Sequence, residues 1–149
     1  MMRKAALLLA LLLGATAADA QLPGLRRRGP VQPQPVLQGI DALRAEFAAQ
    51  SGGTTVYYGS ESTILGPPAR TALVLQAAWL RRHPEVVVRI EGYGDSLDTR
   101  DHALAVGARR AEEVRSYLVL LGVPAAQVST TSWGKERPGL GRAVTVLVR

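Results

Sequence analysis

Between residues 86 and 148 the sequence alternates strand-like and helix-like segments, and this order constrains the fold more than any other feature. Val86–Tyr93 alternates side chains in the two-residue period of a strand with one face against a core. Thr99–Leu121 has apolar residues at helical spacing and ends at Gly122. Two more strand-like segments follow, Val128–Trp133 and Ala143–Val148. A helix between two strands predicts helices layered on a sheet.

The first half of the chain supplies the other elements of this layered structure. Val36–Gln50 carries apolar residues three and four positions apart, which predicts an amphipathic helix, and we place an N-terminal helical unit at residues 36–53. Thr54–Tyr58 is β-branched and aromatic, as strands are. A further helix is predicted from Pro67 to Arg82, before the proline at position 84. After the N-terminal helix the order is βαβαββ. We therefore predict an α/β two-layer sandwich over residues 54–149, with two helices on one face of a mixed four-stranded sheet.

The buried face of the Thr99–Leu121 helix can be read from a helical wheel of about 100° per residue. Arg110 lies at the edge of the apolar stripe, so we expect its side chain to cover the sheet margin and still reach solvent. The stripe itself comprises Leu104, Gly107, Ala111, Val114, Leu118 and Leu121.

The N-terminal 35 residues read as targeting and linking segments. Residues 1–20 combine a basic start, a short apolar run and the small-residue site Ala18-Asp19-Ala20, the pattern of a cleaved signal peptide. The apolar run is about half the roughly 20 residues that span a bilayer. Residues 21–35 are rich in Pro and Arg without an apolar period, which predicts an extended linker. These features predict a soluble envelope protein in the periplasm.

The composition narrows the classes of partner. The chain carries a net charge of +6 and contains no cysteine, which excludes a disulfide framework. A net positive charge can indicate a protein that binds nucleic acid, but a secreted protein rarely meets nucleic acid. We therefore expect no nucleic-acid partner. An anionic membrane surface, the cell-wall polymer and other envelope proteins remain as partners; Arg26-Arg27-Arg28 in the linker is one candidate contact.

Two motifs in the second half of the chain resemble a known family. The strand that begins at Val86 ends in Gly92-Tyr93-Gly94-Asp95, and the next helix carries Ala103, Leu104, Arg109, Arg110 and Ala111. In this arrangement the chain resembles the peptidoglycan-binding domain shared by OmpA, MotB and the peptidoglycan-associated lipoprotein. The resemblance covers about Thr54–Val148 and implies the same βαβαββ fold, with peptidoglycan as the partner.

The resemblance also implies a binding site for diaminopimelate of the stem peptide. The outer end of this residue is a zwitterion, with an ammonium and a carboxylate on one carbon. Asp95 is expected to accept the ammonium, and the planar fork of Arg110 is expected to bind the carboxylate. Backbone N–H groups near Thr99, at the helix start, add donors. The backbone at Gly59 and the neighbouring Tyr58 complete the implied site.

Several positions depart from the family pattern and leave a second function open. Ala103 replaces the helical Asn, Gly59 replaces an acidic residue, and Asp98 stands where the loop usually has Gly. Spacing alone favours a simple internal ion pair between Asp95 and Arg110. The alternative function is therefore a protein-interaction module whose wall-binding site has degenerated, with the linker or the N-terminal helix contacting an envelope partner. An ion pair sealed by Tyr93 or Leu97 would favour this alternative.

Other clusters of polar and aromatic residues favour structural roles. Asp95, Asp98, Asp101 and His102 share one loop, but their spacing matches no calcium-binding loop and acidic groups are favourable at a helix start, so no metal is predicted. Glu91 and Asp95 lie on one face if the strand continues, yet no nucleophile motif accompanies them. We predict no enzymatic activity and no cofactor. Packing is favoured over sugar stacking for the aromatic residues Tyr57, Trp79, Tyr93 and Trp133.

Overall fold

The computed structural model describes residues 35–137 and 141–149. The predicted signal peptide and nearly all of the predicted linker lie outside the described residues. Pro35, which the sequence assigned to the linker, is the first residue of a helix.

The elements follow the predicted order, with small shifts at their ends and one unpredicted turn of 3-10 helix, η1. From the N-terminus they are α1 Pro35–Gln50, β1 Thr55–Tyr57, α2 Pro67–Arg82, β2 Val88–Tyr93, α3 Arg100–Leu120, η1 Ala125–Gln127, β3 Val128–Gly134 and β4 Arg142–Leu147.

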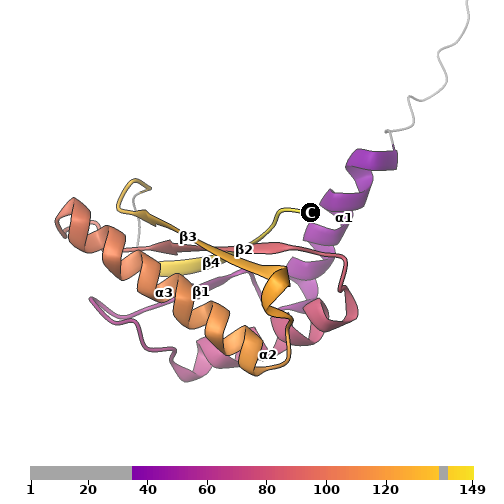
Figure 1. Cartoon of the computed structure of the whole chain (residues 1–149), viewed down its shortest axis with the longest axis horizontal. Helices are drawn as coiled ribbons and strands as arrows, with labels where there is room; N and C mark the ends of the chain where they lie inside the picture. The colour runs from indigo at the N-terminus through magenta and orange to yellow at the C-terminus, as the bar shows by residue number, and fades with distance from the viewer. Residues whose placement is uncertain (1–34, 138–140) are drawn as a thin grey trace, which may run out of the picture. The chain divides into compact units, whose positions relative to one another are not determined.

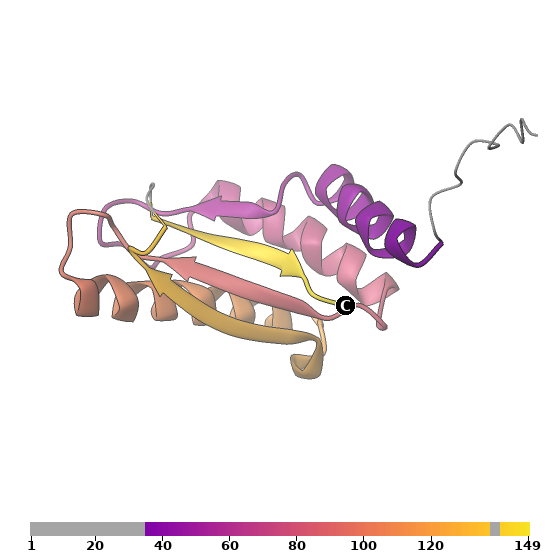
Figure 2. The same cartoon turned by 90° about the horizontal axis from the view of Figure 1, so that it is seen from above.

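The four strands form one mixed sheet in the order β1-β4-β2-β3. β4 pairs antiparallel with β1 and with β2, whereas β2 and β3 are parallel and connected through α3. Helices α2 and α3 cover one face of this sheet (Figures 1 and 2). The predicted two-layer α/β fold with an extra N-terminal helix is confirmed.

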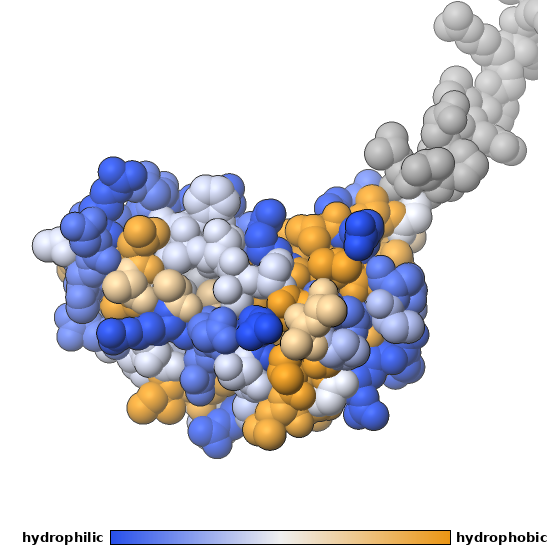
Figure 3. Space-filling model, viewed as in Figure 1, coloured by the Kyte–Doolittle hydropathy of each residue, from blue (hydrophilic) through white to orange (hydrophobic). Residues whose placement is uncertain are grey.

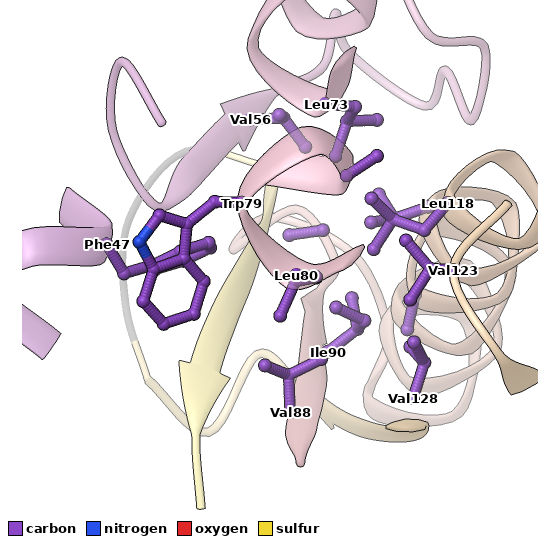
Figure 4. Close-up of a cluster of buried hydrophobic side chains, with 14 of the residues drawn as sticks. Phe47, Val56, Leu73, Trp79, Leu80, Val88, Ile90, Leu118, Val123 and Val128 are labelled. Carbon is purple, nitrogen blue, oxygen red and sulfur yellow. The ribbon is translucent and has the colours of Figure 1, made fainter. Parts of the chain in front are cut away.

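The hydrophobic core lies between the sheet and the two covering helices (Figure 4). Val88 and Ile90 of β2 face the helices and are fully buried, as the alternating pattern predicts. Leu73, Leu80 and Leu118 from the helices pack against them and are also fully buried. Each side chain of this size contributes about 1.5–3 kcal/mol when it leaves water.

Helix α3 lies unusually close to β2 because both carry glycine at the crossing. A Cβ on Gly92 would overlap the carbonyl of Gly107, and a Cβ on Gly94 would overlap the backbone of Ala103. Leu104 was predicted to lie in the buried stripe of α3, and this prediction is wrong, because Leu104 is 47% exposed. Its neighbour Ala103 is fully buried instead. Only a small side chain fits where the backbones approach this closely.

Helix α1 attaches to α2 and to the end of β4. The rings of Phe47 and Trp79 meet edge to face, with centroids 5.0 Å apart, and both side chains are fully buried. The Trp79 indole N–H donates to the Glu46 carboxylate at 3.2 Å, and Arg44 donates to the carbonyl of Leu147 at 3.1 Å. The extra helix is therefore part of the folded unit.

Candidate functional site

A cavity of about 410 Å³ opens at the end of the sheet where β2 leads into α3. The segment after β1, the loop after β2 and the start of β4 all contribute to its wall. Among the described residues that line it, three are acidic and none is basic. The lining residues are Tyr58, Ser60, Glu61, Asp95, Ser96, Leu97, Asp98 and Gly141. In Figure 3 much of the surface at the end where α3 begins is hydrophilic.

Asp95 is held in the cavity wall by two donors. The backbone N–H of Glu61 donates to its Oδ2 at 2.7 Å, and Nη1 of Arg110 donates to its Oδ1 at 3.2 Å. Burial by itself raises the pKa of the Asp95 carboxyl, but these two hydrogen bonds and the Arg110 charge outweigh burial and lower that pKa below its usual value. Asp95 is therefore ionised at neutral pH, with 19% of its side chain exposed.

Arg110 is completely buried behind Asp95, so the expectation that it reaches solvent is wrong. Its guanidinium donates to the carbonyls of Ser62 and Tyr93, each at 2.8 Å, and of Gly59 at 3.2 Å, in addition to Asp95. These acceptors come from two segments, the one after β1 and the end of β2. Burying a charged guanidinium is tolerable only with such compensation. Arg110 thus fastens the segment after β1 to the end of β2.

Gly141 covers the ion pair at the start of β4. A Cβ on this residue would overlap both the Arg110 guanidinium and the Asp95 carboxylate. Its carbonyl accepts a hydrogen bond from the Tyr58 N–H at 3.0 Å. Sequence reasoning missed this role, because nothing in the local pattern around Gly141 indicates that it lies against residues 31 and 46 positions earlier.

The remaining predicted site residues surround this pair in different ways. Tyr58 lines the cavity, places its ring 5.1 Å from the Arg110 guanidinium carbon and donates its hydroxyl to the Arg110 carbonyl at 3.2 Å. Burial raises the pKa of the Tyr58 phenol, which stays protonated. Gly59 contributes its carbonyl to Arg110. Thr99 is the N-cap of α3, where its hydroxyl accepts from the His102 N–H at 3.3 Å.

Glu91 and Asp95 belong to separate hydrogen-bond networks. Glu91 lies on the sheet face opposite α3 but is only 5% exposed. Arg89 and the Tyr93 hydroxyl lie against its carboxylate and donate hydrogen bonds to it at 3.0 and 2.8 Å. Burial raises the pKa of the Glu91 carboxyl, but these hydrogen bonds and the charges of Arg89 and Arg137 lower it overall. Neither carboxylate has the raised pKa of a general acid.

The side chains of Tyr93 and Leu97 do not seal the Asp95–Arg110 ion pair, as the alternative function would require. Leu97 is 99% exposed at the rim of the cavity, and Tyr93 contributes only its backbone carbonyl to Arg110. The side of the pair that faces the cavity belongs to Asp95.

Comparison with known proteins places this arrangement in a family. A sequence profile described as the OmpA family matches residues 57–144, more than half of the chain. The chain belongs to the OmpA family. The matched region includes Asp95, Arg110 and Gly141, so the whole cavity wall lies within the family domain.

Several curated relatives of this OmpA family member are named peptidoglycan-associated lipoprotein. The one from Pseudomonas aeruginosa is 36% identical over 137 residues, which cover 89% of this chain and 81% of the relative. The one from Agrobacterium fabrum is 41% identical over 86 residues, 58% of this chain and 49% of the relative. The chain thus spans about half the length of several of the curated relatives it matches.

Solved structures show the same fold. The peptidoglycan-associated lipoprotein from Burkholderia pseudomallei matches with a TM-score of 0.62 and 34% identity, over 64% of this chain and 91% of that one. The C-terminal domain of Helicobacter pylori MotB matches with a TM-score of 0.57 and 18% identity, over 62% and 81%. Among the described residues of the present chain, no helix has both the length and the apolar character needed to cross a membrane.

Proposed function

We propose that this OmpA family chain binds peptidoglycan in the periplasm, with Asp95 contacting the ammonium at the outer end of diaminopimelate. One observation carries the proposal: an ionised carboxylate stands in the wall of a cavity that Glu61 and Asp98 make more acidic. An ammonium carries three donors and no acceptor, so an acceptor-only carboxylate is its natural partner. The names of the relatives, peptidoglycan-associated lipoprotein, support the choice of polymer.

Arg110 takes the carboxylate of the same ligand by exchange in this proposal. Its contact with Asp95 is a single N–O hydrogen bond at 3.2 Å, not the two-bond fork that makes arginine–carboxylate pairs strong. A zwitterion brings both charges at once, so the ligand can replace the internal pair without leaving a buried charge unpaired. Arg110 is fully buried, so the exchange requires the residues that cover its guanidinium to move.

The other implied residues take supporting roles. Tyr58 and the Gly59 carbonyl hold Arg110 in position, and Thr99 fixes the start of α3 next to the cavity. In this proposal the chain acts by binding alone and carries out no chemical step.

Cosedimentation with purified sacculi tests this function. The parent is expected to sediment with diaminopimelate-type sacculi, and Asp95→Asn is expected to lose most of that binding while its circular dichroism stays unchanged. Asp101→Asn is the matched control, because it removes a carboxylate from the first turn of α3 that does not line the cavity. No binding by the parent overturns the proposal.

Sacculi with lysine in place of diaminopimelate test the role of Arg110. Lysine keeps the ammonium but lacks the second carboxylate. If Arg110 binds that carboxylate, the parent binds lysine-type sacculi at least about tenfold more weakly, since an ion-paired hydrogen bond contributes about 1.5–3 kcal/mol. Equal binding to both types would leave Arg110 as a purely internal partner of Asp95.

The burial of Arg110 favours a second candidate function. Four hydrogen bonds to protein acceptors already satisfy the guanidinium, as in a site that only stabilises loops. In that case the fold is a protein-interaction module, and both types of sacculi fail to bind the parent chain.

A further inference from the structure

Three side chains that could hold a metal ion lie beside the cavity: Glu61 and Asp98, which also line it, and His102. Glu61, Asp98 and His102 place a carboxylate oxygen, a second carboxylate oxygen and an imidazole nitrogen within 4.8 Å of one another. They come from the segment after β1, the loop after β2 and the first turn of α3. Their convergence is produced by the fold, since Glu61 is 37 residues from Asp98.

Oδ2 of Asp98 lies 3.7 Å from Nε2 of His102, within ion-pair range but too far for a hydrogen bond. This oxygen is buried from solvent and accepts no hydrogen bond, while the Asp98 side chain is 16% exposed. A buried carboxylate oxygen without a donor is costly, and such orphan groups are rare in folded proteins.

The geometry is close to that of a zinc site. Zinc–ligand distances of about 2.0–2.2 Å at tetrahedral angles put neighbouring ligand atoms roughly 3.3–3.6 Å apart. Asp98 Oδ2 and His102 Nε2 are 3.7 Å apart. Glu61 is exposed on its loop, so a rotation of its side chain can bring its carboxylate about 1 Å closer, the shift that these spacings require.

The ligand types select the metal. One imidazole with two carboxylates suits zinc and similar transition metals, whereas magnesium and calcium prefer oxygen ligands alone. A dication would also relieve the repulsion between the Glu61 and Asp98 carboxylates. We propose that Glu61, Asp98 and His102 form a Zn²⁺ site that connects the segment after β1 to the start of α3. The site shares Glu61 and Asp98 with the cavity wall, but zinc binding can be measured without peptidoglycan.

Isothermal titration of the full chain without a histidine tag tests this site with ZnCl₂ as the probe. The parent is expected to bind one equivalent of Zn²⁺, and Glu61→Gln and His102→Asn are each expected to weaken binding at least about tenfold. Both residues are exposed, so neither substitution disturbs the core. Circular dichroism without zinc checks that the variants fold.

Two control variants separate this site from other zinc-binding positions. Asp101→Asn removes a neighbouring carboxylate, and His83→Asn removes the other histidine of the chain, which lies 3.3 Å from Glu85. Both controls are expected to bind zinc within about twofold of the parent. Absence of zinc binding by the parent overturns the proposal, and so does binding that is lost in His83→Asn or kept in His102→Asn.

Discussion

At the scale of single residues, the site is organised around one buried guanidinium and the carboxylate in front of it. Arg110 donates to carbonyl oxygens of the segment after β1 and of the end of β2, and Asp95 places a negative charge in the cavity wall. The Glu61 N–H completes the environment of Asp95, from a residue with a φ of 53° in the left-handed region that few non-glycine residues adopt.

The lowered pKa of Asp95 predicts a specific pH dependence of stability. An unfolded aspartate has a pKa of about 3.9, so the contribution of Asp95 to folding is complete above that pH and is lost as pH falls through the lower folded value. The difference in unfolding free energy between the parent and Asp95→Asn should therefore be constant from about pH 7 to 5 and shrink below about pH 4. Urea unfolding at a series of pH values measures this difference.

Glu91 is unchanged in the variant, so its own titration cancels in the comparison. A difference in unfolding free energy that persists undiminished at pH 3 would contradict a lowered pKa of Asp95.

Gly141 is expected to be intolerant of any side chain. Gly141→Ala places a methyl group against Arg110 and Asp95, and overpacking of this kind costs about 1–3 kcal/mol. Thermal unfolding measures the loss. Gly59→Ala is the matched control, because its Cβ meets only the Ser62 Cβ at 3.8 Å, an ordinary contact. Equal stability of the two variants would show that the ion pair is not covered as described.

At the scale of elements, the position of α3 on the sheet determines where the site forms. The glycines at the crossing bring α3 against β2, which puts Arg110 within reach of the Tyr93 carbonyl. Sequence periodicity predicted both elements, but the wheel could not distinguish Ala103 from its neighbour Leu104. Which of the two residues is buried depends on how closely the backbones of α3 and β2 approach, and the sequence of α3 alone does not determine this distance.

Gly107→Ala tests this close approach. In an isolated helix the substitution stabilises by about 1 kcal/mol, but here the new Cβ would lie 2.9 Å from the Gly92 carbonyl oxygen and overlap the Ser132 hydroxyl. The steric cost is larger, so the variant should be less stable than the parent in urea unfolding. Gly39→Ala in α1 meets nothing within 4 Å and should instead stabilise by about 0.5–1 kcal/mol. Stabilisation by both substitutions would contradict a close approach of α3 to β2.

At the scale of the whole molecule, the sequence predicted the layers well and the interior of the site less well. The βαβαββ order follows from periodicities that each segment carries by itself. The burial of Arg110 does not, because its acceptors at Gly59 and Ser62 are 51 and 48 residues away and come together only when the sheet forms. Glu61 is likewise 34 to 41 residues from the acidic loop at residues 95–102, so the sequence did not indicate that they lie together. The position of Asp95 just after β2 was predictable, because the alternating pattern of the strand ends there.

Isothermal titration with a soluble stem peptide measures the proposed contact between Asp95 and an ammonium. The peptide ends in diaminopimelate, and a second peptide differs only by acetylation of the outer amine, which removes the positive charge. We expect the parent to bind the first peptide. Acetylation of the outer amine and the substitution Asp95→Asn should each weaken that binding at least about tenfold. This expectation follows from the loss of a charged hydrogen bond, which contributes about 1.5–3 kcal/mol. Equal affinity for the two peptides would contradict it.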